Sequence, residues 1–480
     1  MTNSQQNTID TPRKSGSVGR KKLPLQIVDF IGKYTNMPLK PHQIEGIEWM
    51  MSRNGGIIAD EMGLGKTYMV CCFIAISIFQ EIATKKKSTH SPILIVVPKI
   101  LISQWKSEFS RMKIAISEYV NKRAISNLTI TTYGNMMRSQ KMREVPWSKV
   151  FFDEAHTLRN PNTRGFISAS LLRGEKWLIT GTPYVNHIRD VHVLLCLVKR
   201  APFSEASVGK DTAKLQKMIE TIKMEYKNNS IARKLSDYIT LPKKHVRTVT
   251  IRPKKEAILH HGLLMQAQDD MECELNYNYF SNSFHIKSRI HAMVLAQMGT
   301  IMPPLLKDKY SANENEYLGD QKEVKKMDQE ISVSFENYSK IQKIITDICS
   351  RRDNGRKKII FTKYDKESDF FKKSFSAMNF DSVEIISGKT SKKMRAYILQ
   401  NPPEILILNI ECASCGLNLT MYTEVYFSCN TWNGMTQTQS EARVYRLGQT
   451  DEVLINKYYI EDSFDEYMNE VRERKMLNSF

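Results

Sequence analysis

The stretch that decides the fold reads Gly55-Gly-Ile-Ile-Ala-Asp-Glu-Met-Gly-Leu-Gly-Lys-Thr67. Its apolar pair predicts a short strand, and the apolar run that follows the stretch predicts a helix. The glycine-bearing turn between them is typical of a phosphate loop, whose backbone N–H groups and helix N-terminus face nucleotide phosphates. Lys66 would reach the β- and γ-phosphates, and the hydroxyl of Thr67 would bind Mg²⁺. The general pattern has glycine where Asp60 stands, so a glycine-rich turn without a ligand is the alternative interpretation.

The charge balance of the chain favours a polyanionic partner. The 480 residues include 70 Lys and Arg against 51 Asp and Glu, which gives a formal net charge of +19. Such an excess favours nucleic acid, with a solvated basic surface as the alternative. The N-terminus is polar and basic, unlike a signal peptide, and the longest apolar run, Met69–Phe79, is too short to span a bilayer. We therefore expect an intracellular protein without a membrane partner.

The eight cysteines, several of them within apolar runs, indicate reduced thiols in a reducing compartment. Cys412 and Cys415 form a C-x-x-C pair, but no second Cys/His pair stands at zinc spacing. We expect no zinc site there.

Buried runs rich in β-branched residues alternate with helical segments, which predicts parallel α/β sheets. In the N-terminal half, such runs begin at Ile93, Leu128, Lys149 and Trp177, and their ends carry hydroxyls, carboxylates, proline or glycine. Because ligands bind at the carboxyl ends of parallel strands, we expect these strand tails to meet at one edge. Further strand runs in the second half lie at 358–362, 383–388, 405–408, 425–427 and 453–460.

We predict an α/β protein with two parallel-sheet lobes, helical insertions and a cleft between the lobes. The expected segments are a disordered basic tail at 1–24, a first lobe at 25–248, a helical linker or protrusion at 249–335, and a second lobe at 336–480. The tail lacks a core-forming pattern and carries basic pairs. It is therefore a candidate nuclear address or DNA-gripping arm, with a plain solvated tail as the alternative.

Two carboxylates, Asp153 and Glu154, follow a strand run and would stand beside the phosphate loop. One carboxylate there can hold Mg²⁺ through water, and a second can polarise the attacking water. We assign Asp153 to Mg²⁺ and Glu154 to the water, with an Asp-Glu pair that merely ends a strand as the alternative. Gln43, on a predicted helix upstream, has an amide that can read the adenine edge.

Two arginines, Arg443 and Arg446, lie in the block Gln439-Ser-Glu-Ala-Arg-Val-Tyr-Arg-Leu-Gly-Gln449. Their spacing of three predicts that both guanidinium groups lie on one helix face. Two arginines aimed across a cleft at the γ-phosphate would stabilise the charge that develops there, once the lobes close. A solvated helix face is the alternative.

These blocks carry a resemblance to a known family. From about Leu39 to the C-terminus, the chain resembles the Swi/Snf-type ATPases of helicase superfamily two in the order and spacing of many short blocks. The blocks are Leu39–Gln43, Asp60–Thr67, Val97–Lys99, Gln104-Trp105, Asp153–His156, Leu178–Pro183, Asn186, Leu241–Lys243, Ile359–Phe361, Gly416–Leu419, Trp432-Asn433 and Gln439–Gln449. In size and in its lack of accessory modules the chain is similar to the baculoviral global transactivator proteins. The acid at position 60 is typical of the family's phosphate loop.

The resemblance implies two RecA-like lobes that hydrolyse ATP with Mg²⁺ and move along one strand of duplex DNA without separating the strands. The catalytic residues that it implies are Lys66, Asp153, Glu154, Arg443 and Arg446. Those implied for nucleotide binding are Gln43, Asp60, Glu61, Met62, Gly63, Leu64, Gly65, Lys66 and Thr67, with Mg²⁺ held through water by Thr67 and Asp153. Those implied for the DNA backbone are Lys99, Thr131, Thr132, Ser387, Gly388 and Asn418. Contacts to phosphates are expected to be sequence-tolerant and salt-sensitive.

The second lobe departs from the family pattern at three places. Ala413-Ser414 stand where the family often has Gly-Gly, Cys429 stands at a usual aspartate, and Gly434 stands at a usual proline. The added Cβ atoms at 413 and 414 would crowd backbone that approaches DNA or the lobe interface. This departure bears on the coupling of ATP turnover to movement rather than on ATP binding.

We therefore expect a DNA-stimulated ATPase that translocates on double-stranded DNA and remodels or displaces DNA-bound protein in transcription regulation. It would act in the nucleus, of a host cell if the protein is viral, on double-stranded DNA or nucleoprotein. Targeting would come from protein partners or from residues 1–24. Two alternatives stay open, namely a strand-separating DNA helicase and a catalytically idle DNA-binding transcription cofactor.

Overall fold

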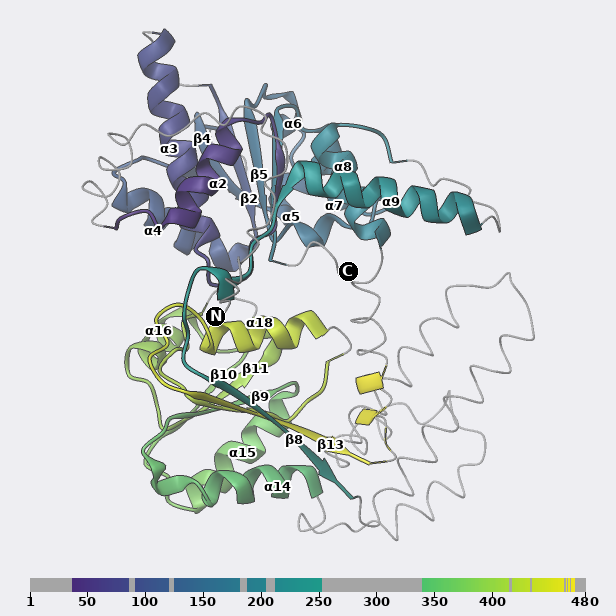
Figure 1. Cartoon of the computed structure of the whole chain (residues 1–480). Helices are drawn as coiled ribbons and strands as arrows, with labels where there is room; N and C mark the ends of the chain where they lie inside the picture. The colour runs from purple at the N-terminus through teal and green to yellow at the C-terminus, as the bar shows by residue number, and fades with distance from the viewer. Residues whose placement is uncertain are drawn as a thin grey trace, which may run out of the picture. The chain divides into compact units, whose positions relative to one another are not determined.

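The described part of the chain forms two compact α/β units (Figure 1). The computed structural model describes residues 37–85, 91–120, 125–181, 188–203, 212–252, 339–413, 417–431 and 434–461, with further single positions up to 470. Among them, unit 1 holds residues 37–181 and 188–238, and unit 2 begins at Ile239. The prediction of two α/β lobes is confirmed. The tail at 1–24, and the predicted linker beyond residue 252, lie outside the described residues.

Unit 1 is built on a sheet of seven parallel strands in the order β3-β4-β2-β5-β6-β1-β7. The strands are β1 (Gly56–Ile58), β2 (Ile93–Val97), β3 (Ser117–Glu118), β4 (Leu128–Thr132), β5 (Lys149–Asp153), β6 (Glu175–Ile179) and β7 (Ser230–Ile231). All five residues of β2 are buried, as expected for a strand covered on both faces. Because β5, β6 and β1 are consecutive neighbours, their polar tails meet at one edge, as predicted.

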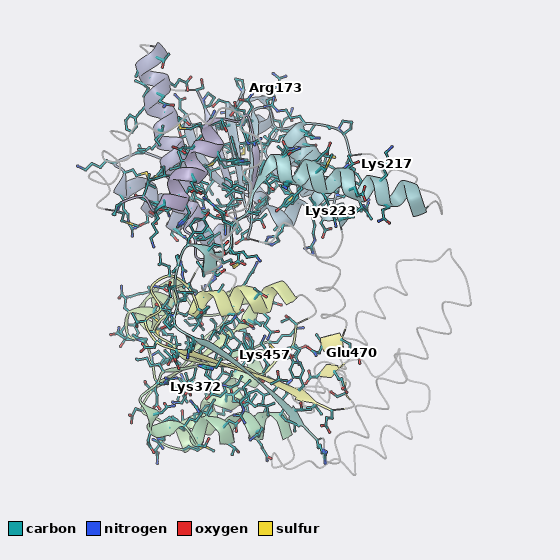
Figure 2. The ribbon with its side chains drawn as sticks, viewed as in Figure 1. Arg173, Lys217, Lys223, Lys372, Lys457 and Glu470 are labelled. Atoms are coloured by element: carbon teal, nitrogen blue, oxygen red, sulfur yellow. The ribbon has the colours of Figure 1, made fainter. Side chains whose placement is uncertain are left out.

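The helices of unit 1 are α2 (Pro41–Met51), α3 (Lys66–Lys85), α4 (Ile102–Arg111), α5 (Tyr133–Arg138), α6 (Lys141–Glu144), α7 (Arg164–Leu171), α8 (Ile188–Lys199) and α9 (Thr212–Asn229), with 3₁₀ turns η1 (Lys99–Leu101), η2 (Ala155–Leu158) and η3 (Leu235–Asp237). The central helix α3 is long and apolar enough to cross a membrane by length and composition. Its side chains instead pack in the core of unit 1 with Phe151 and Trp177, and more than half of it is buried. Helices α8 and α9 carry several basic residues, and Figure 2 shows Lys217 and Lys223 on α9.

Unit 2 is built on six parallel strands in the order β10-β11-β9-β12-β13-β8. The strands are β8 (Lys244–Ile251), β9 (Lys358–Thr362), β10 (Val383–Ile386), β11 (Ile405–Asn409), β12 (Glu424–Phe427) and β13 (Val453–Ile460). The helices are α14 (Ser339–Cys349), α15 (Asp365–Ala377), α16 (Lys392–Gln400), α17 (Ile410–Ala413) and α18 (Gly434–Val444), with a 3₁₀ turn η5 (Arg352–Asn354). Every strand run predicted for the second half is therefore present in this sheet.

The boundary between the units lies earlier in the chain than residue 248, the end predicted for the first lobe, because the edge strand β8 belongs to unit 2. All eight of its residues pair in parallel with β13, and the division falls between Tyr238 and Ile239. In Figure 1 this strand, coloured teal, lies beside yellow β13. Most side chains of β8 are exposed, so the strand joins the sheet through backbone pairing rather than through an apolar run. That is why its sequence did not show which sheet it joins.

Candidate active site

The phosphate loop lies between β1 and α3, as the strand-loop-helix prediction requires. Gly63 and Gly65 have φ of 94° and 76°, a left-handed conformation that glycine adopts without strain. A Cβ atom at Gly65 would stand 2.7 Å from Nε2 of Gln43. The last glycine is therefore required by both the backbone and the close approach of Gln43.

Lys66 is the first residue of α3, and its ammonium group folds over the loop. Its Nζ donates to the backbone oxygens of Asp60, at 2.6 Å, and Glu61, at 3.1 Å. A Cβ atom on Gly181, just past the end of β6, would be 3.5 Å from the same Nζ. The lysine thus lies among the carboxyl ends of the central strands, where a ligand of a parallel sheet binds.

Gln43 lies in the first turn of α2, against the loop. Its Oε1 accepts from the backbone N–H of Lys40, at 3.0 Å, and its Nε2 donates to the backbone oxygen of Leu64, at 3.4 Å. The ring of the preceding residue, His42, donates from Nε2 to the same oxygen, at 2.9 Å. Because both side chains contact Leu64, the predicted base reader is held directly on the phosphate loop.

Asp60 stands where the general phosphate-loop pattern has glycine, and its carboxylate forms an ion pair with Arg233. Nε and Nη2 of Arg233 donate to its two oxygens, at 2.9 and 2.5 Å. The parallel pairing of β1 with β7 aligns Ile58 with Ile231, so the residues two positions further along each strand, Asp60 and Arg233, come together. The sequence did not identify Arg233, since β7 contributes two residues within a basic helical stretch.

The Asp153 carboxylate ends β5 and is engaged at both oxygens. Oδ2 accepts from the indole Nε1 of Trp105, at 2.8 Å, and Oδ1 accepts from the backbone N–H of Glu154, at 3.0 Å. Burial, reinforced by the nearby charge of Glu154, raises the pKa of Asp153 to about 6, while the Trp105 donor and the charge of Lys66 lower it. Because β5 and β1 both pair with β6 in parallel, this carboxylate ends at the same edge of the sheet as the loop, as predicted.

The next residue, Glu154, has a left-handed backbone, with φ 52° and ψ 46°. This conformation is uncommon for a residue with a side chain, and it turns the chain out of the strand direction and into η2. Its Oε2 lies 3.3 Å from Nδ1 of His156, and the hydroxyl of Thr180 lies 3.5 Å from the same nitrogen. Strand tails from β5 and β6 are therefore connected through His156, while Thr182 and Pro183 lie outside the described residues.

The donor set suits a Mg²⁺ ion that is bound together with phosphates. Among the described residues, no group of three or more His, Cys, Asp or Glu side chains could hold a metal by itself. Mg²⁺ commonly uses one or two protein oxygens, several waters and substrate phosphates. Thr67 is the second residue of α3 and Asp153 ends β5, and a hydroxyl and a carboxylate are oxygen ligands of the kind that this requirement asks for.

The two arginines predicted for catalysis belong to unit 2 and occupy different local structures. Arg443 is in the last turn of α18, but the helix ends at Val444, so Arg446 lies beyond it. The prediction that both sit on one helix face is therefore wrong, because the chain turns into the segment that leads to Gly448, whose φ is 98°. Burial, and then the charge of Arg443, lower the pKa of Arg446.

The residues predicted to contact DNA lie in both units, and all of them except Asn418 are at or next to the carboxyl end of a strand. Lys99 follows β2 and is exposed, and Thr132 ends β4, where its hydroxyl caps α5 by accepting from the N–H of Asn135, at 3.2 Å. Thr131 is fully buried and its hydroxyl donates to the backbone oxygen of Tyr119, so this burial does not support a DNA contact. The remaining candidates are in unit 2, at Ser387 and Gly388 after β10 and at the exposed Asn418.

Of the positions at which unit 2 departs from the family pattern, Ala413, Cys429 and Gly434 lie within the described residues. The backbone of Ala413 ends α17, and Gly434 begins α18, while Ser414, Gly416, Trp432 and Asn433 lie outside the described residues. Cys429 is fully buried after β12, and burial raises the pKa of its thiol well above the ordinary value. It therefore stands as a neutral thiol where the family has a charged aspartate.

Comparisons with known proteins agree with the two units. A model of the SNF2-related domain matches residues 42–276, and one of the helicase conserved C-terminal domain matches residues 337–448. Among curated relatives, the ISWI chromatin-remodeling complex ATPase of Saccharomyces cerevisiae is 24% identical over 92% of this chain and 40% of its own length. A probable global transactivator of Orgyia pseudotsugata multicapsid polyhedrosis virus is 22% identical over 91% of this chain and 90% of its own. The chain spans less than half the length of several curated relatives, the ISWI ATPase among them.

Among solved structures, the SWI2/SNF2 ATPase core of Sulfolobus solfataricus in complex with dsDNA is 22% identical to this chain. The match covers 90% of each chain with a TM-score of 0.40.

Proposed function

Since this chain belongs to the SNF2-related family of helicase superfamily two, we propose that it is a DNA-stimulated ATPase that translocates on double-stranded DNA and remodels or displaces bound protein. The observation that carries the proposal is the grouping of Lys66, Asp153 and Glu154 at one edge of the unit 1 sheet. A lysine over a phosphate loop, together with carboxylates that can hold Mg²⁺ and position the attacking water, recurs in enzymes that hydrolyse nucleoside triphosphates.

In the proposed reaction, the Lys66 ammonium exchanges its two backbone acceptors for oxygens of the β- and γ-phosphates. Gln43 presents its amide to the adenine edge, and Glu154 orients the attacking water and accepts its proton. A bound Mg²⁺, held by Thr67 and Asp153, would neutralise charge on the phosphates. Arg443 and Arg446 would stabilise the charge that develops on the γ-phosphate when unit 2 closes on unit 1.

The DNA contacts that we propose are to backbone phosphates, from Lys99 and Thr132 in unit 1 and from Ser387, Gly388 and Asn418 in unit 2. The net charge of +19 supports a polyanionic partner. The names of the relatives, which include a chromatin-remodelling ATPase and a probable global transactivator, support action on nucleoprotein in transcription regulation, in the nucleus. Protein partners would then select the target.

The test is ATP hydrolysis with and without duplex DNA at two salt concentrations. We expect hydrolysis that duplex DNA stimulates, with stimulation that falls as salt rises. Hydrolysis that duplex DNA leaves unchanged would overturn the motor assignment, and no hydrolysis at all would favour an idle DNA-binding cofactor.

A second assay separates translocation from strand separation. We expect the protein to displace a third strand from a triplex while leaving a forked duplex annealed. Efficient unwinding of the fork would favour the strand-separating helicase instead.

A further inference from the structure

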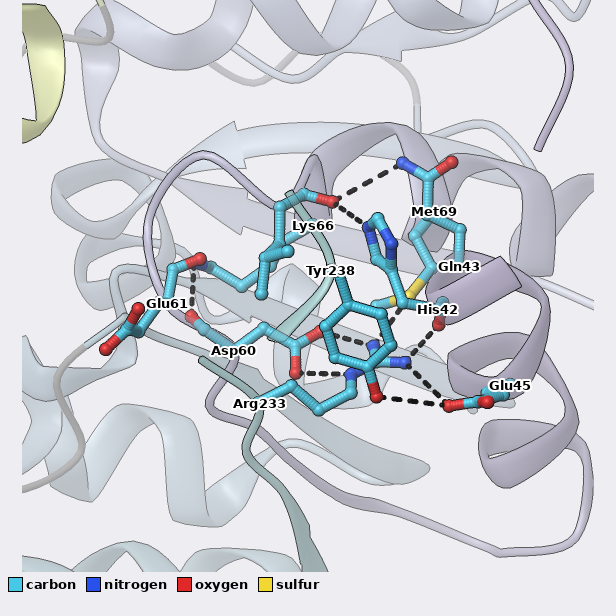
Figure 3. Close-up of polar contacts among 10 residues, drawn as sticks. His42, Gln43, Glu45, Asp60, Glu61, Lys66, Met69, Arg233 and Tyr238 are labelled. Carbon is cyan, nitrogen blue, oxygen red and sulfur yellow. Dashed lines mark hydrogen bonds and ion pairs between the residues drawn. The ribbon is translucent and has the colours of Figure 1, made fainter. Parts of the chain in front are cut away.

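The Arg233 guanidinium group joins three parts of unit 1 (Figure 3). Nε and Nη2 donate to Asp60 in the phosphate loop, as described above, and Nη1 donates to the backbone oxygen of His42 in α2. Its own backbone oxygen accepts from the N–H of Glu61, at 2.9 Å, and thereby continues the pairing of β1 with β7. One residue therefore connects the phosphate loop, the base-reading helix and the last strand of the unit.

Helix α2 has a glycine, Gly46, at the point where the Arg233 side chain packs against it. A Cβ atom at Gly46 would lie 2.9 Å from Nη2 of Arg233 and 2.3 Å from Sδ of Met69. The absence of a side chain at 46 lets the guanidinium group reach His42, whose neighbour is Gln43. The position of Gln43 relative to the loop is thus set from two sides, by Leu64 directly and by Arg233 through His42.

The same contacts extend to the end of unit 1. The ring of Tyr238, its last residue, lies 5.1 Å from the ring of His42 and 5.9 Å from the Arg233 guanidinium carbon. The Tyr238 hydroxyl donates to Glu45, at 3.4 Å, and Nη1 of Arg233 lies 3.9 Å from the same carboxylate. The base-reading helix is therefore also tied to the point at which the chain leaves the unit.

The pair of Asp60 and Arg233 is almost out of contact with water, with side chains 1% and 8% exposed. A buried pair of this kind fixes the relative orientation of its two side chains, because the planar guanidinium group of arginine matches a carboxylate in one geometry. Lysine keeps the charge but has no fork and cannot donate to Asp60 and His42 in the same way. A lysine at position 233 therefore separates a positioning role of Arg233 from a simple need for a positive charge.

We propose that Arg233 is a positioning residue that fixes Gln43 against the phosphate loop and thereby sets both the affinity for ATP and the preference for adenine. The inference rests on the proposed ATPase function. It accounts for the aspartate at position 60, which serves as the anchor of Arg233.

The experiment compares Arg233→Lys with Lys234→Ala, an exposed neighbour that serves as the control. Steady-state hydrolysis of ATP and of GTP is measured with the full chain and saturating duplex DNA. For Arg233→Lys we expect KM for ATP to rise about tenfold, with kcat changed by less than about threefold, since charge-assisted hydrogen bonds are lost away from the reacting atoms. The ratio of kcat/KM for ATP to that for GTP should fall about fivefold, and Lys234→Ala should match the wild type.

A merely structural role would lower the active fraction, which reduces kcat for both nucleotides and leaves KM and the nucleotide preference unchanged. That result would overturn the inference, as would a wild-type enzyme that does not prefer ATP over GTP. A wild-type chain that hydrolyses no ATP would instead overturn the proposed function. If Arg233→Lys does not fold, as judged by circular dichroism, Asp60→Asn provides the same test. It keeps the size of the side chain, and unchanged KM and preference in that variant would contradict the proposal.

Discussion

Glu154 is held in a left-handed conformation next to a carboxylate that is engaged at both oxygens, so the two adjacent acids have different surroundings. Trp105 and the backbone fix Asp153, whereas Glu154 faces His156. On this difference we base the separate roles that we propose for them, metal binding for Asp153 and water activation for Glu154.

The first residue-scale prediction concerns Glu154→Gln. The amide keeps the size of the side chain but cannot accept a proton, so ATP should bind with an unchanged Kd while kcat falls about 100-fold or more. Binding by calorimetry and DNA-stimulated hydrolysis measure the two quantities. Glu175→Gln is the control, because Glu175 begins β6 at the opposite edge of the sheet, where it pairs with Lys149. Turnover that survives in Glu154→Gln would remove this residue from its role.

The second residue-scale prediction concerns Trp105→Phe, which deletes the indole donor to Oδ2 of Asp153. An outer partner of a metal-binding carboxylate typically contributes about tenfold to metal affinity. We expect the Mg²⁺ concentration for half-maximal hydrolysis to rise about tenfold. In Trp147→Phe, another buried indole of unit 1 loses its bond to the backbone oxygen of Met142. Equal Mg²⁺ dependence in both variants would show that Trp105 is needed for folding alone.

At the scale of elements, the turn between β1 and α3 brings the base reader and the phosphate loop into contact. Gly65→Ala places a Cβ atom in a left-handed position and 2.7 Å from Gln43. The backbone strain costs about 1–2 kcal/mol, and the displaced amide should raise KM for ATP more than tenfold. Gly355→Ala is the control, because Gly355 has φ of 66° with no atom within 4 Å of the new Cβ. It should lower the free energy of unfolding similarly without changing KM, and a shared KM effect would contradict the assignment.

At the scale of the whole molecule, the residues that we propose for ATP hydrolysis belong to both units. The phosphate loop and both carboxylates are in unit 1, while Arg443 and Arg446 are in unit 2. Under the proposed function, we expect ATP to bind to unit 1 residues and its hydrolysis to depend on positive charge from unit 2.

The whole-molecule prediction concerns Arg446→Ala. A contact made mainly in the transition state lowers kcat without weakening ground-state binding, so kcat should fall about 100-fold or more while Kd for ATP changes less than about threefold. Lys373→Ala removes one positive charge from the exposed surface of α15 and serves as the control. If the affinity for ATP fell by the same factor as kcat, Arg446 would contribute to nucleotide binding instead.

Several features could be predicted from the sequence because they depend on neighbouring residues. Apolar runs such as Ile93–Val97 predicted the buried parallel strands, and the polar residues after each run predicted the edge at which the site lies. The phosphate loop and Asp153 follow from the same pattern. Parallel strands all end at one edge, so local periodicity together with chain direction is sufficient to bring these residues together.

Other features depend on which strands become neighbours, and only the tertiary structure decides that. Arg233 meets Asp60 across 173 positions of sequence because β7 pairs with β1, and Trp105 meets Asp153 across 48 positions. The assignment of β8 to unit 2 likewise follows from its pairing with β13. The sequence thus determined the chemistry that each strand end offers. The packing of the strands decided which distant side chains hold that chemistry in place, because such contacts leave no periodic signal along the chain.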